Sequence, residues 1–183
     1  MDTDWASYRF VTDPGIAAEA IERRRGRPPA PHELAALRAR FLALLAEESY
    51  AEVPGAAALL RALRGRRDIA LAIATGAWRQ SALLKLARAR VPVDGLPMAT
   101  ADDAVSREEI LRIAARRAGG PFDRTTSVGD AVWDVAAARV LGARFVGISC
   151  DNDPGKLAAA GATRILPDLR DMDRFLEAAG VAK

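Results

Sequence analysis

The stretch "TTSVGDAVWDVAAARVLGARFVGIS", residues 125–149, decides the fold class of this chain. Its first part, Thr125–Val128, is a short strand-like run that ends at a glycine. Val132–Leu141 then carries apolar residues at helical spacing, and Arg144–Ile148 is again an apolar, strand-like run. A strand, a helix and a second strand in this order predict a right-handed βαβ unit, in which the two strands are parallel.

The same alternation extends outward from this unit over residues 53–183. The run Ile69–Ala74 is continuously apolar, as expected for a strand that is covered on both faces. Further short strands are expected at 96–99 and 163–166, and helices at 57–63, 77–90, 106–118, 154–160 and 169–179. The pattern predicts an α/β protein with a Rossmann-like parallel sheet.

Residues 1–52 differ from the rest of the chain, because they contain two helical patterns and no convincing strand. The patterns cover about Gly15–Arg25 and His32–Glu48, and a proline-rich turn separates them. Ser49–Pro54 is the expected hinge into the α/β part. We therefore expect a helical cap segment over residues 1–52 and an α/β core over residues 53–183.

The composition narrows the function classes. The chain has 183 residues and is 50% hydrophobic, enough for one core with a small accessory domain. Its 27 Lys and Arg against 24 Asp and Glu are spread along the chain, which argues against a nucleic-acid partner. No apolar run reaches the eighteen or so residues of a membrane span, so no membrane partner is expected.

Two rare residues limit the chemistry. The single cysteine, Cys150, excludes an internal disulfide, and we expect it to be a small buried residue in a reducing, cytoplasmic protein. The single histidine, His32, is expected to be exposed in the first turn of a helix, and multi-histidine zinc sites cannot form. A metal site built from oxygen ligands, such as carboxylates, remains possible for this chain.

Asp130 and Asp134 stand four positions apart, directly after a predicted strand. Ligands of open parallel sheets bind beyond the carboxyl ends of the strands, which is where Asp130 falls. Asp134, in the first turn of the next helix, can point to the same place, so the two carboxylates are candidate ligands for Mg²⁺. The alternative is structural: Asp130 caps the helix, and Asp134 interacts with its positive end.

Thr75 and Gly76 end another buried strand and precede a helix. Their hydroxyl and backbone N–H groups would face the same edge of the sheet and could bind a phosphate group, although such residues are also ordinary at strand ends. Arg107, in the first turn of the helix that begins at Ser106, would add a permanent positive charge there. Its alternative interpretation is a surface arginine.

Three segments together resemble a known family. In their order, "IALAIATGA" (69–77), "DDAVSREEI" (102–110) and "SVGDAVWDVAAARVLGARFVGIS" (127–149) resemble motifs two, three and four of the haloacid dehalogenase-like (HAD) hydrolases. The resemblance implies that Thr75 holds the transferring phosphoryl group and that Asp130 binds Mg²⁺ with support from Asp134. The third motif usually has lysine, so Arg107 is a departure, but it keeps the charge and can bind phosphate with two N–H groups.

The segment "TDWASYRFVTDPGIAAEAIERRRGRPP", residues 3–29, resembles the helical cap of phosphoglycolate-phosphatase-like members of that superfamily. Caps of this kind exclude water and select substrates. The resemblance implies that Trp5, Tyr8, Thr12 and Asp13 could face the site. Asp13 stands before a proline, however, and has the simpler interpretation of a helix N-cap.

The family also places a nucleophilic aspartate and an acid–base aspartate at the end of its first, central strand. No apolar run of this kind precedes the cap segment, and only Asp2-Thr3-Asp4 imitates the pattern, with a single residue before it. A strand needs about five residues to take its place in a sheet. We therefore expect the first central strand to be absent, which would leave backbone groups and apolar side chains in the sheet without partners.

These observations predict a Mg²⁺-dependent phosphatase that acts on a small phosphorylated metabolite through an aspartyl-phosphate. The chain as printed is expected to be truncated and inactive, because the nucleophile is absent. The alternative is a non-catalytic phosphate-binding or interaction protein derived from the same fold. A receiver-like signalling domain shares the acidic site and the parallel sheet, but the helical segment before the α/β part argues against it.

Overall fold

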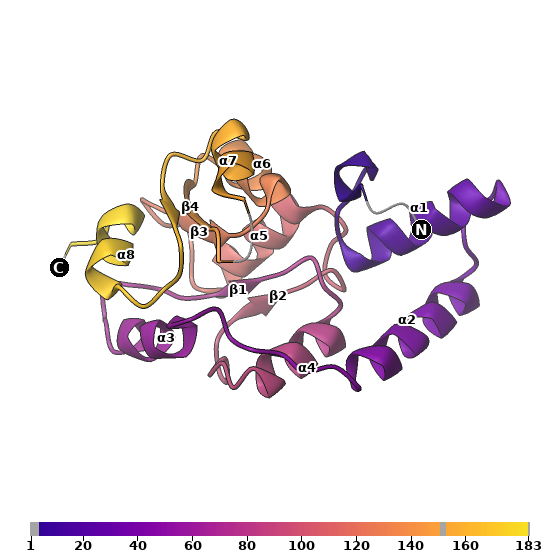
Figure 1. Cartoon of the computed structure of the whole chain (residues 1–183), viewed down its shortest axis with the longest axis horizontal. Helices are drawn as coiled ribbons and strands as arrows, with labels where there is room; N and C mark the ends of the chain where they lie inside the picture. The colour runs from indigo at the N-terminus through magenta and orange to yellow at the C-terminus, as the bar shows by residue number, and fades with distance from the viewer. Residues whose placement is uncertain (1–3, 151–152, 183) are drawn as a thin grey trace.

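The structure is a computed structural model that describes residues 4–150 and 153–182 (Figure 1). The segment Asp2-Thr3 lies outside the described residues. The strands are β1 (Ile73–Ala74), β2 (Met98–Ala99), β3 (Thr126–Gly129), β4 (Arg144–Ile148) and β5 (Ile165–Leu166). The helices are η1 (Trp5–Ser7), α1 (Asp13–Arg25), α2 (Pro31–Leu45), α3 (Ala56–Arg64), α4 (Arg79–Arg88), α5 (Arg107–Arg117), α6 (Val132–Val140), α7 (Pro154–Ala159) and α8 (Met172–Ala179).

The predicted βαβ unit is present as β3, α6 and β4. The two strands are parallel and pair Thr126 with Arg144 and Gly129 with Gly147, and β5 continues the sheet on the other side of β4. α6 packs against this sheet through Val135 and Ala138, which form a buried cluster with residues of β4 and α7. The α/β class with parallel strands, which the sequence predicts, is confirmed.

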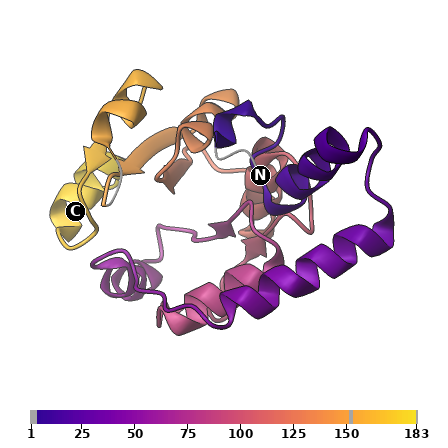
Figure 2. The ribbon, with the colours of Figure 1, turned by 45° about the vertical axis from the view of Figure 1, so that its right-hand side comes forward.

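The strands form two separate sheets instead of one. β1 pairs with β2, and β3, β4 and β5 pair in that order, and no pairing joins β1 to β3 within residues 4–150 and 153–182. Figures 1 and 2 show the two sheets as separate groups of arrows. Among the described strands only β4 has a neighbour on both sides, so β1 and β2 are both edges of the first sheet, and β3 and β5 are the edges of the second.

The hydrogen bonds show which backbone groups these edges expose. Ile73 and Thr75 donate their N–H groups toward β2, at 2.8 and 3.1 Å. In a parallel ladder alternate residues bond to opposite sides, so the backbone groups of Ala74 point away from β2. By the same alternation, Val128 directs its backbone groups away from β4, and its residue is 44% exposed. β1 is also shorter than the predicted run Ile69–Ala74, because only one neighbouring strand supports it.

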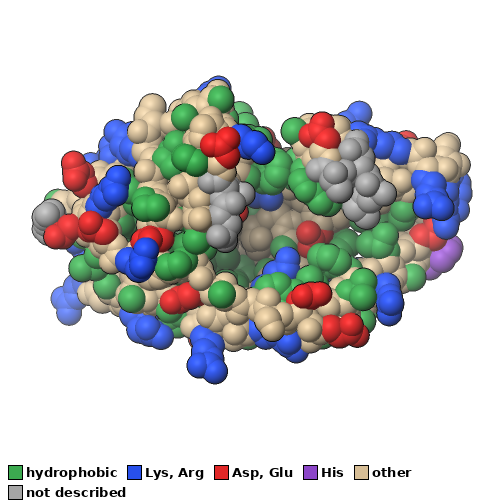
Figure 3. Space-filling model, in the orientation of Figure 1, with side chains coloured by type: hydrophobic (Ala, Val, Ile, Leu, Met, Phe, Trp, Pro, Cys, Tyr) green, Lys and Arg blue, Asp and Glu red, His purple; other side chains and the backbone are tan. Residues whose placement is uncertain are grey.

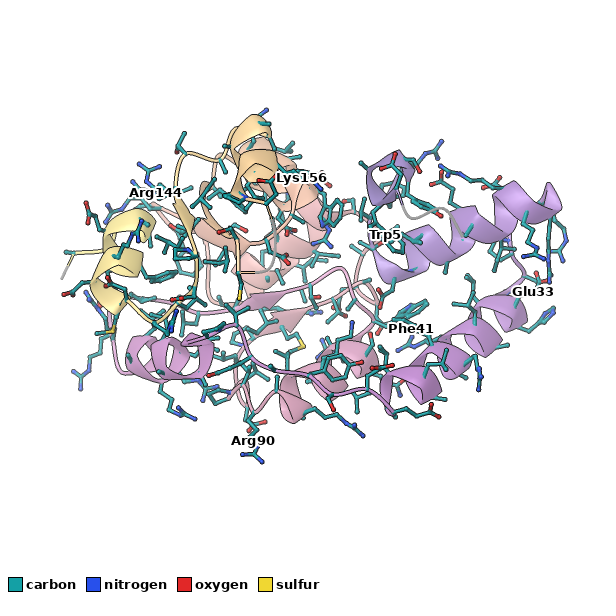
Figure 4. The ribbon with its side chains drawn as sticks, in the orientation of Figure 1. Trp5, Glu33, Phe41, Arg90, Arg144 and Lys156 are labelled. Carbon is teal, nitrogen blue, oxygen red and sulfur yellow. The ribbon has the colours of Figure 1, made fainter. Side chains whose placement is uncertain are left out.

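Helices α1 and α2 extend to one side of the strands, and the described residues before residue 53 contain no strand, as predicted (Figure 1). α2 packs against α4, where the rings of Phe41 and Trp78 meet edge to face with centroids 5.8 Å apart (Figure 4). The division into a cap segment over residues 1–52 and a core over residues 53–183 stays a prediction.

One prediction about the rare residues is confirmed, and one is wrong. His32 is exposed in the first turn of α2, as predicted. Cys150 is exposed instead of buried, because β4 ends at Ile148 and the cysteine lies beyond it, in the turn that follows. Within the described part of the chain, no helix has both the length and the apolar character needed to cross a membrane.

Candidate phosphate and metal site

The five predicted site residues line a single cavity of about 300 Å³ at the carboxyl ends of β1 and β3. Its lining comprises Ala74, Thr75, Gly76, Arg107, Ile110, Leu111, Ser127, Val128, Gly129, Asp130, Trp133 and Asp134. The face drawn in Figure 3 is hollowed near its centre, between the part that carries α6 and α7 and the helices α1 and α2. The five residues come from three distant segments and lie together at this edge of the sheet, where the topological rule places them.

An ion pair joins two of these residues. Nη1 of Arg107 lies 2.5 Å from Oδ1 of Asp134, and both side chains are largely buried, at 25% and 16% exposed. Burial raises the pKa of the Asp134 carboxyl group above its ordinary value. The positive charge of Arg107 opposes this increase, and the nearby charge of Asp130 adds to it.

The guanidinium of Arg107 makes three further contacts, with Val11, Trp133 and Gly76. Its Nε donates to the carbonyl oxygen of Val11 at 2.9 Å, and its guanidinium lies 5.7 Å from the ring centroid of Trp133. A Cβ atom placed on Gly76 would lie only 2.9 Å from Nη2 of Arg107. Glycine at position 76 therefore lets the guanidinium lie against the turn that follows β1.

Gly129 likewise leaves space for a neighbouring side chain, the carboxylate of Asp134. A Cβ atom at this position would lie 2.7 Å from Oδ2 of Asp134, so only glycine lets the carboxylate approach the end of β3. Asp134 lies in the first turn of α6, as predicted. The alternative interpretation of Asp130 as the helix cap is wrong, since the N-cap of α6 is Ala131 and no side chain caps it.

The turn after β1 offers two groups to an anion. Oγ1 of Thr75 accepts a hydrogen bond from the N–H of Ala77 at 3.2 Å, which leaves the hydroxyl hydrogen available as a donor. Gly76 is a buried residue, and its N–H has no hydrogen-bond partner among the residues that the structure describes. Both groups lie in the lining of the cavity that Arg107 also reaches.

The first residue of α1, Asp13, bonds to this turn. Asp13 donates its N–H to the carbonyl oxygen of Gly76 at 2.8 Å, and its Oδ2 accepts from the N–H of Trp78 and from Oγ of Ser81. The predicted N-cap role of Asp13 is wrong, because Thr12 is the N-cap of α1 and accepts from the N–H of Gly15. The carboxylate of Asp13 instead stabilises the start of α4.

The four residues of the cap segment expected to face the site do not line this cavity, although Thr12 and Asp13 lie against Gly76. Trp5, Tyr8, Thr12 and Asp13 are all absent from the lining of the cavity. Thr12 is buried and donates its hydroxyl to the carbonyl oxygen of Val105 at 3.0 Å. Sequence reasoning missed Trp133, although its position between the two aspartates on a predicted helix already placed it near the site.

The oxygen ligands present fit Mg²⁺ but do not form a complete protein cage. The described side chains include no group of three or more His, Cys, Asp or Glu that could hold a metal ion. Mg²⁺ normally takes one or two carboxylates and completes its octahedron with waters and a substrate phosphate. Asp130 and Asp134 supply two carboxylates, and the missing Cβ of Gly129 lets that of Asp134 lie against the end of β3.

Comparison with known proteins identifies the family. The model of the haloacid dehalogenase-like hydrolases matches residues 6–142. The chain belongs to the haloacid dehalogenase-like hydrolase family. This match confirms the resemblance that the three sequence motifs indicate. No curated protein sequence matches the chain at a significant level.

Solved structures of HAD proteins superpose on most of the chain. A hydrolase from Pseudomonas syringae is 26% identical, with a TM-score of 0.72, over 91% of this chain and 78% of that one. A HAD family hydrolase from Deinococcus radiodurans, with bound phosphate and sodium, is 25% identical, with a TM-score of 0.65, over 89% and 74%. A mutant of CbbY from Rhodobacter sphaeroides, in complex with xylulose-(1,5)bisphosphate, is 27% identical, with a TM-score of 0.63, over 84% and 72%.

Proposed function

We propose that this HAD protein is a Mg²⁺-dependent phosphatase whose substrate is a small phosphorylated metabolite. The observation that carries the proposal is the shared cavity, in which anion-binding groups and two carboxylates from separate segments meet. The similar proteins from Deinococcus radiodurans and Rhodobacter sphaeroides are described with phosphate and with a sugar bisphosphate, which supports this substrate class.

Each residue has a proposed task. The hydroxyl of Thr75 and the N–H of Gly76 donate hydrogen bonds to the phosphoryl oxygens, and Arg107 supplies the positive charge that neutralises them. Asp130 and Asp134 hold Mg²⁺, which supplies further positive charge to the phosphate when it is bound. Trp133 forms an apolar wall that limits the access of water beside the guanidinium.

The proposed reaction needs a nucleophilic aspartate in addition to the described lining. Among the described residues, only Asp130 and Asp134 bring carboxylates to the cavity, and both are assigned to the metal ion. A strand inserted between β1 and β3 would end at the same edge of the sheet, so an aspartate at its end could attack the phosphorus atom. We therefore propose that the chain as printed is inactive and that a strand of this kind restores activity.

The helical segment over residues 1–52 is proposed to act as the cap that covers this site, with residues 53–183 as the core. The bond between Asp13 and Gly76 supports this assignment, because it joins the start of α1 to the anion-binding turn. The cytoplasmic location expected from the single cysteine stays a prediction.

A second candidate function is a non-catalytic phosphate-binding protein. It is favoured by the ion pair between Arg107 and Asp134, which already neutralises one of the two metal-binding carboxylates. Such a protein would bind phosphate through Thr75, Gly76 and Arg107 without turning over an ester.

Hydrolysis of p-nitrophenyl phosphate with Mg²⁺ tests the first proposal against the second. The chain as printed should be inactive, whereas a chain extended at its N-terminus by an apolar strand that ends in Asp-x-Asp should turn over the ester. An inactive extended chain that still binds inorganic phosphate through Thr75 would favour the binding protein. Equal turnover by both forms would show that the nucleophile lies elsewhere.

A further inference from the structure

The ion pair between Arg107 and Asp134 joins the anion-binding and the metal-binding halves of the cavity. We propose that it couples the two ligands: a divalent metal ion and a tetrahedral anion bind cooperatively, because each takes over one member of the pair. The inference rests on the proposed function, in which Arg107 receives phosphate and Asp134 receives the metal ion.

The geometry shows why one ligand alone is disfavoured. Oδ1 of Asp134 is occupied by Nη1 of Arg107 at 2.5 Å, and its Oδ2 lies against Gly129. A dication bound at this carboxylate would lie beside the guanidinium, and the two positive charges would repel each other. The metal ion therefore binds well only when Arg107 turns toward another negative group.

An anion that binds without the metal ion leaves a negative charge without its positive partner. If Arg107 turns toward a phosphate at Gly76, the carboxylate of Asp134 stays behind with its countercharge removed. That side chain is only 16% exposed, and a largely buried carboxylate that loses its positive partner is costly even though backbone groups of Ala131 and Asp130 still bond to it. Asp130 adds a second negative charge nearby, which increases the cost. A metal ion bound at Asp134 would replace the lost positive charge and remove this cost. The anion should therefore bind more tightly when the metal ion is present.

The contacts of Arg107 are suited to such a change of partner. Its Nε is anchored to the carbonyl oxygen of Val11, so the guanidinium can turn about a fixed point. Its Nη2 already lies beside Gly76, where the proposed anion binds. The nearby ring of Trp133 should report the movement through its fluorescence.

The test measures metal affinity without requiring turnover. Mn²⁺ replaces Mg²⁺, so that binding is seen by electron paramagnetic resonance, and sulfate serves as a tetrahedral anion that coordinates divalent ions weakly. In the unaltered chain, saturating sulfate should tighten Mn²⁺ binding by about fivefold or more, at the lower end of ordinary coupling. Arg107→Gln should bind Mn²⁺ more tightly than the unaltered chain when sulfate is absent, and sulfate should no longer change its affinity.

The matched control is Arg112→Gln, which removes an equal charge from the exposed face of α5, 47% exposed, without touching the cavity. It should behave as the unaltered chain does. If Arg107→Gln binds Mn²⁺ no more tightly than the unaltered chain, the coupling is wrong, although the metal site stands. If Mn²⁺ does not bind the unaltered chain, or if Asp130→Asn and Asp134→Asn leave its affinity unchanged, the proposed function itself is wrong.

Reciprocity provides a second measurement that does not depend on Arg107→Gln, in case that variant does not fold. Mn²⁺ must tighten sulfate binding by the same factor by which sulfate tightens Mn²⁺ binding. The fluorescence of Trp133 is obtained by subtracting the emission of Trp133→Phe from that of the unaltered chain. Its change when both ligands are bound should exceed the sum of the changes that each ligand causes alone. Independent binding of the two ligands would overturn the inference.

Discussion

Arg38 on α2 binds both carboxylate oxygens of Asp102, with Nη1 at 2.7 Å and Nη2 at 3.1 Å. Asp102 also accepts from the backbone N–H of Arg79 at 2.8 Å, and the guanidinium of Arg38 lies 5.7 Å from the ring centroid of Trp78. This two-pronged ion pair connects α2 to the segment that follows β2. It holds the second helix of the proposed cap against the α/β part.

Replacing Arg38 should loosen this connection. Arg38→Ala removes a two-pronged ion pair between half-buried groups, which is worth about 1 kcal/mol of unfolding free energy. Hydrogen exchange of the amides of α2 should accelerate more than that of α6. Arg40→Ala, an exposed arginine on the same helix, is the matched control and should leave both rates unchanged. Equal protection of α2 in the two variants would contradict the expectation.

Gly129→Ala should damage the metal site more than the fold. The added methyl group would lie 2.7 Å from Oδ2 of Asp134, so the carboxylate must move from the end of β3. We expect weaker Mn²⁺ binding, measured by calorimetry. Gly65→Ala adds the same methyl group where the nearest contact is 3.5 Å and should not alter binding. Unchanged affinity in Gly129→Ala would show that this approach is not needed.

Thr75 can be tested by two substitutions of similar size. Thr75→Val removes the hydroxyl that accepts from Ala77 and that is proposed to bind the phosphoryl group. In an active, strand-extended chain it should lower kcat by about a hundredfold, the usual cost of losing one such donor. Thr75→Ser keeps the hydroxyl and should retain most of the activity. Similar kcat values for both variants would remove Thr75 from the proposed mechanism.

Asp103 should contribute a pH-dependent part of the stability. Its hydrogen bond from Arg117, at 2.7 Å, and further bonds from Thr100 lower the pKa of its carboxyl group from 3.8 to about 2. Because the folded pKa is depressed, the stabilisation is complete above the unfolded pKa and is lost as the pH falls through the folded value. Urea titrations should show Asp103→Asn less stable than the unaltered chain at pH 7.

The difference between Asp103→Asn and the unaltered chain should shrink as the pH falls from about 4 to about 2, the interval between the two pKa values. Asp94→Asn serves as the control, because Asp94 is exposed and its side chain makes no hydrogen bond within the described part of the chain. A difference that stays constant down to pH 2 would show that the carboxylate charge does not contribute.

Much of the fold was predictable because it depends on local patterns. β4 begins and ends where the apolar run Arg144–Ile148 does, and α5 begins after Ser106, whose side chain accepts from the N–H of Glu109 as expected of a cap. β1 is shorter than its apolar run, because strand length also depends on neighbours that no local pattern reveals. The exposure of Cys150 was missed for another reason, since β4 ends at Ile148 as predicted and the cysteine lies in the turn beyond it.

The site was predictable in position but not in detail. Parallel strands place their carboxyl ends together, so Thr75 and Asp130 had to lie near each other once the strands were assigned. The ion pair of Arg107 with Asp134 depends on how two side chains from different helices reach across a cavity, which the spacing along the chain does not reveal. The contacts of Asp13 likewise follow from the docking of α1 on α4.

The open edges of β1 and β3 have a consequence for the handling of the protein. Unsatisfied N–H and C=O groups in a row are a template for any extended polypeptide, including another molecule of the same kind. Concentrated solutions should therefore form intermolecular β-structure while each molecule is still folded, and a short proline-free peptide that fits the opening should suppress it. These open edges should therefore influence the solubility of the protein in addition to its overall charge.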